Sequence, residues 1–194
     1  GRGVVHNFFQ IVGRLLKIMP AMRISKSQDL PPPFEGMKDL HFFNDPRLAL
    51  GETPSATANC SARGLARVAA LMAAQGRWQG REILSQDAWH AMHAEPHHAG
   101  LGDLMPTRFT QGGVCQFVSC GPDTMHLERA FNEGREGFFG WMGLGGSIFQ
   151  WHPELDIGFA FVPTELHVLD LFNERGKRYQ AAVLRCVRAL STMR

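Results

Sequence analysis

The clearest pattern in the sequence is a helical spacing of apolar residues. They recur at intervals of three and four over residues 8–19, 61–75 and 177–190, which places them on one face of an α-helix. Ser61 and Ser85 occupy N-cap positions, so we predict one helix from Ser61 to about Gln75, ended by Gly76, and a shorter one from Ser85 through Met92. The apolar face of the last helix comprises Tyr179, Ala182, Val183, Cys186, Val187 and Leu190, and the opposite, solvated basic face carries Lys177, Arg178, Arg185 and Arg188.

Strand patterns occupy the second half of the chain. We predict strands over residues 109–118, interrupted at Gly112-Gly113, and over residues 147–151 and 157–162. The last is a nearly continuous apolar run, which is typical of a central strand covered on both faces. Between residues 25 and 60 the pattern disappears, which predicts a long irregular segment.

The order of these elements predicts the fold class. Helices come first, then strands, then a closing helix, and there is no internal repeat and no clear second domain. This arrangement favours an α+β fold with a mainly antiparallel sheet flanked by helices, in one domain over residues 1–194.

Composition narrows the classes of function. Hydrophobic residues make up 44% of the chain, enough for a core, and no apolar stretch approaches the ~18 residues of a membrane span. The net charge of +2 gives no argument for nucleic-acid binding. Cys60, Cys115, Cys120 and Cys186 contain no C-x-x-C spacing, which favours free thiols in a reducing compartment; a Cys115–Cys120 disulfide is the alternative. The sequence leaves the oligomeric state open, a homo-oligomer included.

Three groups of side chains invite a chemical interpretation. His90, His93, His97 and His98 cluster with Glu95, but the spacing is not H-E-x-x-H and Pro96 breaks the segment, so we expect a solvated helix end and no metal site. Ser147, His152 and Asp156 lie in one hairpin without a G-x-S-x-G motif, so no catalytic triad is expected. Cys120 with nearby His126 suggests a thiol nucleophile less strongly than it suggests a partly buried cysteine beside a turn.

The glycine-rich run from Phe139 to Ser147 carries a family resemblance. Together with other segments it resembles the β-lactamase-related serine hydrolases, which include penicillin-binding peptidases, esterases and animal β-lactamase-like proteins. The segments are Asn44-Asp45-Pro46, Glu52–Ala56, Ala62–Arg67, Gly76–Leu84, Gly140–Ser147, the Pro153-Glu154 turn and the Ile157–Val162 strand. They follow the family's order over about residues 44 to 190.

The resemblance implies a fold and a mechanism. It implies an antiparallel sheet with helices on both sides, as in part of a β-lactamase/transpeptidase-like fold, and no cofactor. A serine in an S-x-x-K motif attacks an acyl carbonyl of a small-molecule or peptide substrate, a Lys and a Tyr manage the proton, and backbone amides stabilise the oxyanion. By this analogy the Leu144 amide is an oxyanion donor, Gly143 lets the substrate approach, and Trp141, Met142 and Gly145 line the substrate side.

The chain also departs from the family. It contains no S-x-x-K, and its one tyrosine, Tyr179, lies in the terminal helix, so we expect a C-terminal portion that is inactive alone and lacks an upstream, nucleophile-bearing half. Such a portion should expose apolar surface where that half packs. Trp141 stands where the family has Lys or His; it suits an uncharged ester or peptide acyl group, or it merely packs in a dead site. A catalytically silent binding or scaffold protein, and an unrelated binding domain, are the alternatives.

Overall fold

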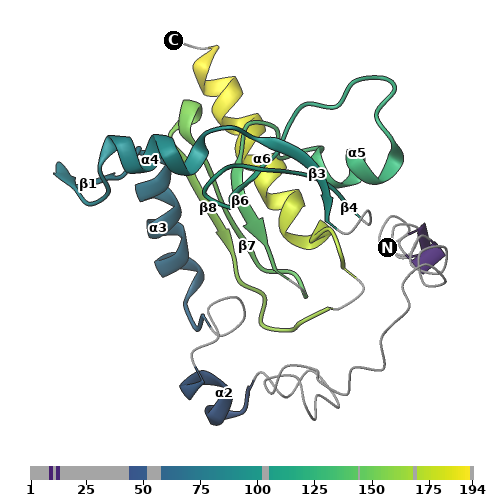
Figure 1. The fold of residues 1–194 in the computed structure, drawn as a ribbon, viewed down its shortest axis with the longest axis horizontal. Helices are drawn as coiled ribbons and strands as arrows, with labels where there is room; N and C mark the ends of the chain where they lie inside the picture. Colours follow the sequence, from purple (N-terminus) through teal and green to yellow (C-terminus); the bar gives the residue numbers. More distant parts are fainter. Residues whose placement is uncertain are drawn as a thin grey trace.

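The fold is α+β, with helices packed against antiparallel strands (Figure 1). The structure is a computed structural model that describes residues 9–10, 12–13, 44–51, 58–101, 105–143, 145–167 and 170–192. Its helices are α2 (Pro46–Leu50), α3 (Ala62–Ala73), α4 (Gln86–His93), α5 (His126–Asn132), the 3-10 turn η3 (Pro153–Leu155) and α6 (Glu174–Ser191). Its strands are β1 (Arg77–Trp78), β2 (Arg81–Glu82), β3 (His97–Leu101), β4 (Met105–Phe109), β5 (Cys115–Gln116), β6 (Phe139–Met142), β7 (Ile148–His152) and β8 (Ile157–Phe161).

The strands form a meander. β3 to β8 make a six-stranded sheet in sequence order, every neighbouring pair antiparallel, while β1 and β2 form a separate hairpin. In β6 and β7, Met142 pairs with Ile148 and Trp141 with Phe149. Antiparallel neighbours need only short connections, but the connection between β5 and β6 is longer and contains α5.

Alternation along β7 separates two cores. Ile148 faces α6, where a Cβ on Gly176 would meet its Cδ1 atom, whereas Trp151 belongs to the cluster under α3 and α4. On the α6 side the buried cluster is Cys115, Phe117, Leu127, Phe131, Phe138, Met142, Ile148, Phe172 and Leu184. On the other side it is Ala69, Met72, Ala73, Trp89, Val114 and Trp151. The sheet is therefore covered by helices on both faces, as predicted.

Helix α3 packs directly on β8 because Gly158 has no side chain. A Cβ at Gly158 would overlap the backbone nitrogen of Ala70 and lie 2.6 Å from the carbonyl carbon of Ala69. A larger residue would push the helix away from the strand, so this glycine sets the distance between α3 and the sheet. Figure 1 shows α3 running beside β8.

The predicted caps are confirmed. Ser61 Oγ accepts the Gly64 N–H at 3.1 Å, and Ser85 Oγ accepts the Ala88 N–H at 3.2 Å. After the C-cap Ala74, Gln75 is left-handed with a φ of 53°, and Gly76 follows with a φ of +84° and donates its N–H to the Leu71 carbonyl at 2.9 Å, which ends the helix one residue before the predicted glycine. Local rules therefore define these two helices.

Several element predictions need correction. The pattern over residues 109–118 is not one interrupted strand, because Gly112 and Gly113 turn the chain between β4 and β5. The segment predicted to be irregular contains α2, and β3, β4 and α5 were not predicted. β8, predicted to be central, is at the edge of the sheet formed by the described residues.

Helix α6 uses a different face from the one its apolar pattern predicts. Gly176, Gln180 and Leu184 are buried against the sheet, whereas Tyr179 is 62% and Leu190 63% exposed. Gln180 is accommodated by donating to Gln150 Oε1 at 2.6 Å. A buried glutamine pair thus replaced the apolar contacts that we expected.

The remaining expectations have mixed outcomes. Of the helix predicted over residues 8–19, only residues 9–10 and 12–13 lie among the described residues, and they are helical. Cys60, Cys115, Cys120 and Cys186 are all free thiols, so the alternative disulfide is not formed. Within the described part of the chain, no helix is long and apolar enough to cross a membrane.

Candidate functional site

The glycine-rich run forms the tight turn between β6 and β7. The Gly143 N–H donates to the Ser147 carbonyl at 2.8 Å, and the Gly146 N–H donates to the Gly143 carbonyl at 3.3 Å. Gly145 and Gly146 have φ values of +87° and +121°, which other residues adopt only with strain. The glycines are therefore required by the path of the backbone.

Asn173 holds both ends of this turn from the side of α6. Its Nδ2 donates to the Gly143 carbonyl at 3.1 Å and to the Ser147 carbonyl at 2.5 Å. Asn173 is 1% exposed and adopts a left-handed conformation with φ of 52°, which asparagine tolerates better than most residues. A single buried amide therefore joins the hairpin to the start of the last helix.

Arg175 holds the tip of the turn. Its Nη2 donates to the Gly145 carbonyl at 2.7 Å, and its Nε lies 3.3 Å from Asp170 Oδ2. Asp170 is 2% exposed and also accepts the Glu174 N–H at 2.6 Å, so it satisfies the first backbone donor of α6. The Asp170 carboxylate thereby fixes both the helix and the guanidinium that reaches the turn.

Arg135 supports this arrangement from inside the α6-side core. It is fully buried and donates to the Phe131 carbonyl at 2.7 Å and to the Phe172 carbonyl. Burial lowers the pKa of Arg135 to about 10, opposed by Glu174 and Asp170, so it stays protonated at neutral pH. It connects α5 to the residue that precedes Asn173.

The predicted substrate-side residues occupy different environments. The Trp141 ring is half-buried and lies 5.3 Å from the Phe109 ring, centre to centre, while Met142 is 5% exposed and belongs to the core. Gly143 and Gly145 lie in the turn, but Leu144 lies outside the described residues. The structure therefore brings the turn together with Asn173 and Arg175, and it places Met142 inward.

The other candidate groups do not form sites. His152 Nδ1 accepts the Leu155 N–H at 3.3 Å and its ring meets Phe138, whereas Asp156 is exposed on the turn. His93 turns inward from α4 and His97 lies on β3. Across the described ranges, no three His, Cys, Asp or Glu residues are arranged to hold a metal ion.

His93 instead links three aromatic side chains. It stacks on Trp89 with ring centres 3.8 Å apart, its Nδ1 lies 2.7 Å from the Trp89 carbonyl, and the Trp151 Nε1–H donates to its Nε2 at 2.9 Å. This requires a neutral ring that carries its proton on Nδ1. Burial lowers the pKa of His93, partly opposed by the bond to the Trp89 carbonyl.

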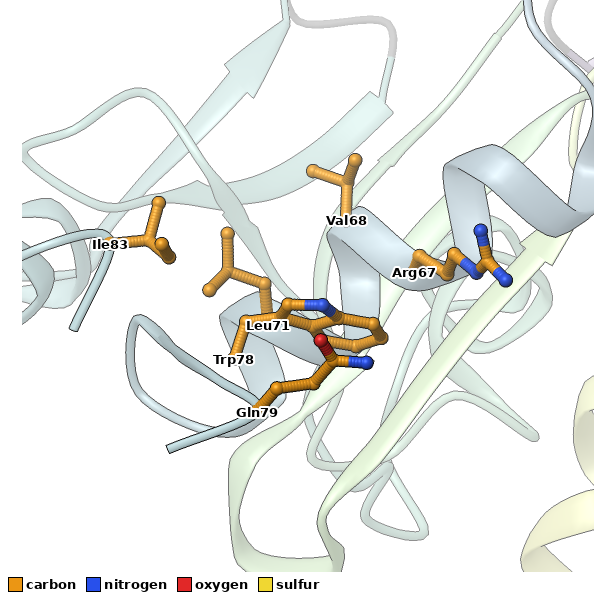
Figure 2. A pocket seen from close by; sticks show the side chains of 6 residues that line it. All are labelled: Arg67, Val68, Leu71, Trp78, Gln79 and Ile83. Carbon is orange, nitrogen blue, oxygen red and sulfur yellow. The ribbon is translucent and has the colours of Figure 1, made fainter. Parts of the chain in front are cut away.

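A groove lies between α3 and the β1–β2 hairpin. It has a volume of about 530 Å³ and is lined by Arg67, Val68, Leu71, Trp78, Gln79 and Ile83. Figure 2 shows the α3 side chains facing those of the hairpin. Its lining contains no carboxylate, histidine, hydroxyl or thiol, and none of its residues belongs to the glycine turn or contacts it through the bonds described above.

Sequence reasoning missed Asp170, Asn173, Arg175 and Arg135. The Asn173-Glu174 pair before a periodic segment was a usable indication of a helix start. No sequence pattern indicated that these side chains reach a turn about thirty residues earlier, because that contact depends on how α6 packs across the sheet.

Comparisons with known proteins give no identification. The chain matches no protein-family model, no curated protein and no solved structure.

Proposed function

We propose that this chain is the C-terminal portion of a β-lactamase-related serine hydrolase. The parent enzyme acts on an ester, amide or peptide through an acyl-enzyme, and this portion supplies a wall of the substrate pocket and a backbone oxyanion donor. The nucleophilic serine and its lysine come from polypeptide upstream of Gly1. The chain by itself is inactive.

One observation carries the proposal: side chains at the start of α6 hydrogen-bond to the backbone of the glycine turn. Carbonyl oxygens of Gly143, Gly145 and Ser147 each accept a hydrogen bond from Asn173 or Arg175. An oxyanion hole requires backbone donors that are fixed before the reaction begins. The Gly143 carbonyl belongs to the same peptide unit as the proposed donor N–H. Asn173 therefore hydrogen-bonds to that unit directly.

The residue at the position of the family's third box, Trp141, bears on the charge of the substrate. Trp141 offers a large apolar ring and one N–H donor, and it carries no charge. A positive charge at this position would favour an anionic substrate, so its absence favours a neutral ester or peptide acyl group. Trp141 would contact the apolar part of such a group.

A catalytically silent scaffold is the second candidate. The observation in its favour is that the Trp141 ring is already engaged, with Phe109 and with Phe131 at 6.3 Å between ring centres. A residue committed to the core has less area to offer a substrate. In this case the turn would be retained for its structural role.

The test is fluorophosphonate labelling of the polypeptide extended upstream of Gly1, analysed by peptide mass. The proposal requires a label on a serine that lies three residues before a lysine, and no label on residues 1–194 alone. Asn173→Ala should slow the labelling at least tenfold. The matched control is Asp156→Asn, an exposed left-handed position in the next turn of the sheet, which should label at the wild-type rate.

Absence of labelling in a folded extended polypeptide would overturn the hydrolase proposal and leave the scaffold. Labelling that is equally fast in Asn173→Ala would retain the hydrolase but would remove the turn from the mechanism.

A further inference from the structure

The hydrogen bond between Trp151 and His93 carries an inference that does not depend on the hydrolase proposal. An indole nitrogen can only donate, so the bond of 2.9 Å makes His93 Nε2 an acceptor and leaves the ring proton on Nδ1. Nδ1 then donates to the Trp89 carbonyl, 2.7 Å away. A neutral ring thus uses both of its nitrogens, whereas a protonated ring has no acceptor left for the Trp151 N–H.

His93 joins α4 to the middle of the sheet. Its ring stacks on Trp89 of the same helix, and it meets Phe139 on β6 at 4.9 Å and Trp151 on β7 at 5.8 Å between ring centres. Trp151 is 3% exposed. Protonation of His93 therefore turns a second N–H toward a buried donor, and that donor loses its partner.

No carboxylate compensates a positive charge on His93. Within the described part of the chain, the charged group that acts on it is His90, one turn earlier in α4, which opposes protonation. Asp87 and Glu95, the acidic residues on either side in the sequence, are exposed and do not act on the ring. The side chains whose rings contact His93 are uncharged: Trp89, Phe139 and Trp151.

The other contacts of α4 are few. Trp89 is its one fully buried residue, and the Trp89 Nε1–H donates to the Met72 carbonyl of α3 at 2.8 Å. At the end of the helix, backbone N–H groups of the β4–β5 turn donate to the carbonyls of Met92 and Ala94 at 3.2 and 2.9 Å. These backbone bonds do not titrate, so they can act as a hinge. A segment with so little buried apolar surface opens more readily than the whole domain unfolds.

We propose that protonation of His93 releases α4 from the sheet while the α6-side core stays folded, so that this contact is a pH-sensitive switch. None of the buried residues of the α6-side core belongs to α4. In the open form the His93 ring is hydrated and has the ordinary His pKa of 6.5, whereas burial lowers that pKa in the closed form. The open form therefore binds more protons, and its population rises as the pH falls below about 6.5.

The test is NMR of the 194-residue chain between pH 8 and pH 5, following the His93 imidazole and the tryptophan indole N–H groups. As His93 becomes protonated, solvent exchange of the Trp89 and Trp151 indole protons should become at least about tenfold faster than at pH 8, after correction for the intrinsic effect of pH. Trp141, which packs against the α6-side core, is the internal control and should keep its signal. The amides of α6 should stay dispersed.

Two variants separate His93 from other titrating groups. His93→Gln offers Trp151 an acceptor that does not titrate, so the two indole signals should no longer respond to acid. His97→Gln, at an exposed position on β3, should respond as wild type does.

Three results would overturn the proposal. In the first, all indole signals and the α6 amides change together, which is unfolding of the whole domain. In the second, the Trp89 indole stays protected while His93 titrates, which means that the ring moves and the helix does not. In the third, His93 remains neutral down to pH 5. All three are read from the wild-type chain, so the test does not depend on the variants folding.

Discussion

The side chain of Asn173 donates to the carbonyl of Gly143 across 3.1 Å, joining the start of α6 to the β6–β7 turn thirty residues earlier. The same nitrogen also reaches Ser147, on the other strand of the turn. The two ends of a hairpin whose glycines would otherwise allow many conformations are thus joined by one buried amide.

Replacing the Asn173 amide should destabilise the chain. Asn173→Asp keeps the size of the side chain and its tolerance of a left-handed backbone, but it turns the donor toward the two carbonyls into an acceptor. We expect a loss of about 1–3 kcal/mol in the free energy of unfolding, because buried carbonyls lose their partner. Urea denaturation measures it, and Asp156→Asn should lie within about 0.5 kcal/mol of wild type. An Asn173→Asp variant with the wild-type free energy of unfolding would show that the turn does not depend on this amide.

Gly158 tests the contact between α3 and β8. Gly158→Ala should destabilise by about 1–3 kcal/mol, since the added methyl group overlaps the α3 backbone and forces the helix outward. Gly121→Ala is the control, because a Cβ there meets only Thr124 Oγ1 at 3.9 Å. Thermal melts of both variants give the comparison. Similar melting temperatures for the two would contradict direct packing of α3 on the strand.

The neutral state of His93 predicts a pH dependence of stability. The ordinary His pKa is 6.5 and burial lowers the pKa of His93 in the folded chain, so the unfolded chain binds more protons between these two values. Stability is therefore full above about pH 6.5 and falls as the pH drops toward the folded pKa, where protonation costs the Trp151 bond. Burial also lowers the pKa of His152, which contributes with the same sign.

The measurement is the urea midpoint between pH 8 and pH 5. His93→Gln should make the decline with acid shallower, whereas His97→Gln, at an exposed position on β3, should leave it unchanged. An unchanged slope in His93→Gln would assign the acid sensitivity to other groups.

Substitutions of Trp141 test whether its ring serves packing or is available for substrate contact. Trp141→Lys introduces the charge that the third box of β-lactamase-related hydrolases carries, but it removes the ring contacts with Phe109 and Phe131. We therefore expect a loss of about 1–3 kcal/mol in the free energy of unfolding, smaller than for a fully buried tryptophan. Trp141→Phe should lose about 1 kcal/mol or less. Calorimetry of both variants checks the order. A Trp141→Lys chain as stable as wild type would show that the fold does not need the ring for packing. The ring of the natural chain would then be available to a substrate, and the scaffold interpretation would be weakened.

Prediction from sequence succeeded where the information is local. Ser61, Ser85 and Gly76 define helix boundaries through contacts within a few residues, and the same positions are found in the structure. It failed for the 109–118 strand, because the pattern alone could not show whether the two glycines interrupt one strand or turn between two.

The candidate site was only partly predictable. The glycines mark the turn in the sequence, because a tight backbone path requires residues without a side chain. Asn173 and Arg175 carry no such indication, since they reach the turn only through the packing of α6 on the sheet. Met142 is similar: its place in the run suggested a pocket wall, and strand alternation directed it into the core.

The sequence alone determined the α+β class, the capped helices α3 and α4, the β7–β8 hairpin and the position of the glycine turn. These depend on periodicity, caps and turn residues, which act over a few neighbours. Only the tertiary structure decided that β8 lies at an edge, that α6 buries Gln180 in place of Tyr179, and that Asn173 and Arg175 hold the turn. Such features depend on which surfaces meet, and contacts between residues far apart in the chain leave no pattern in a single sequence.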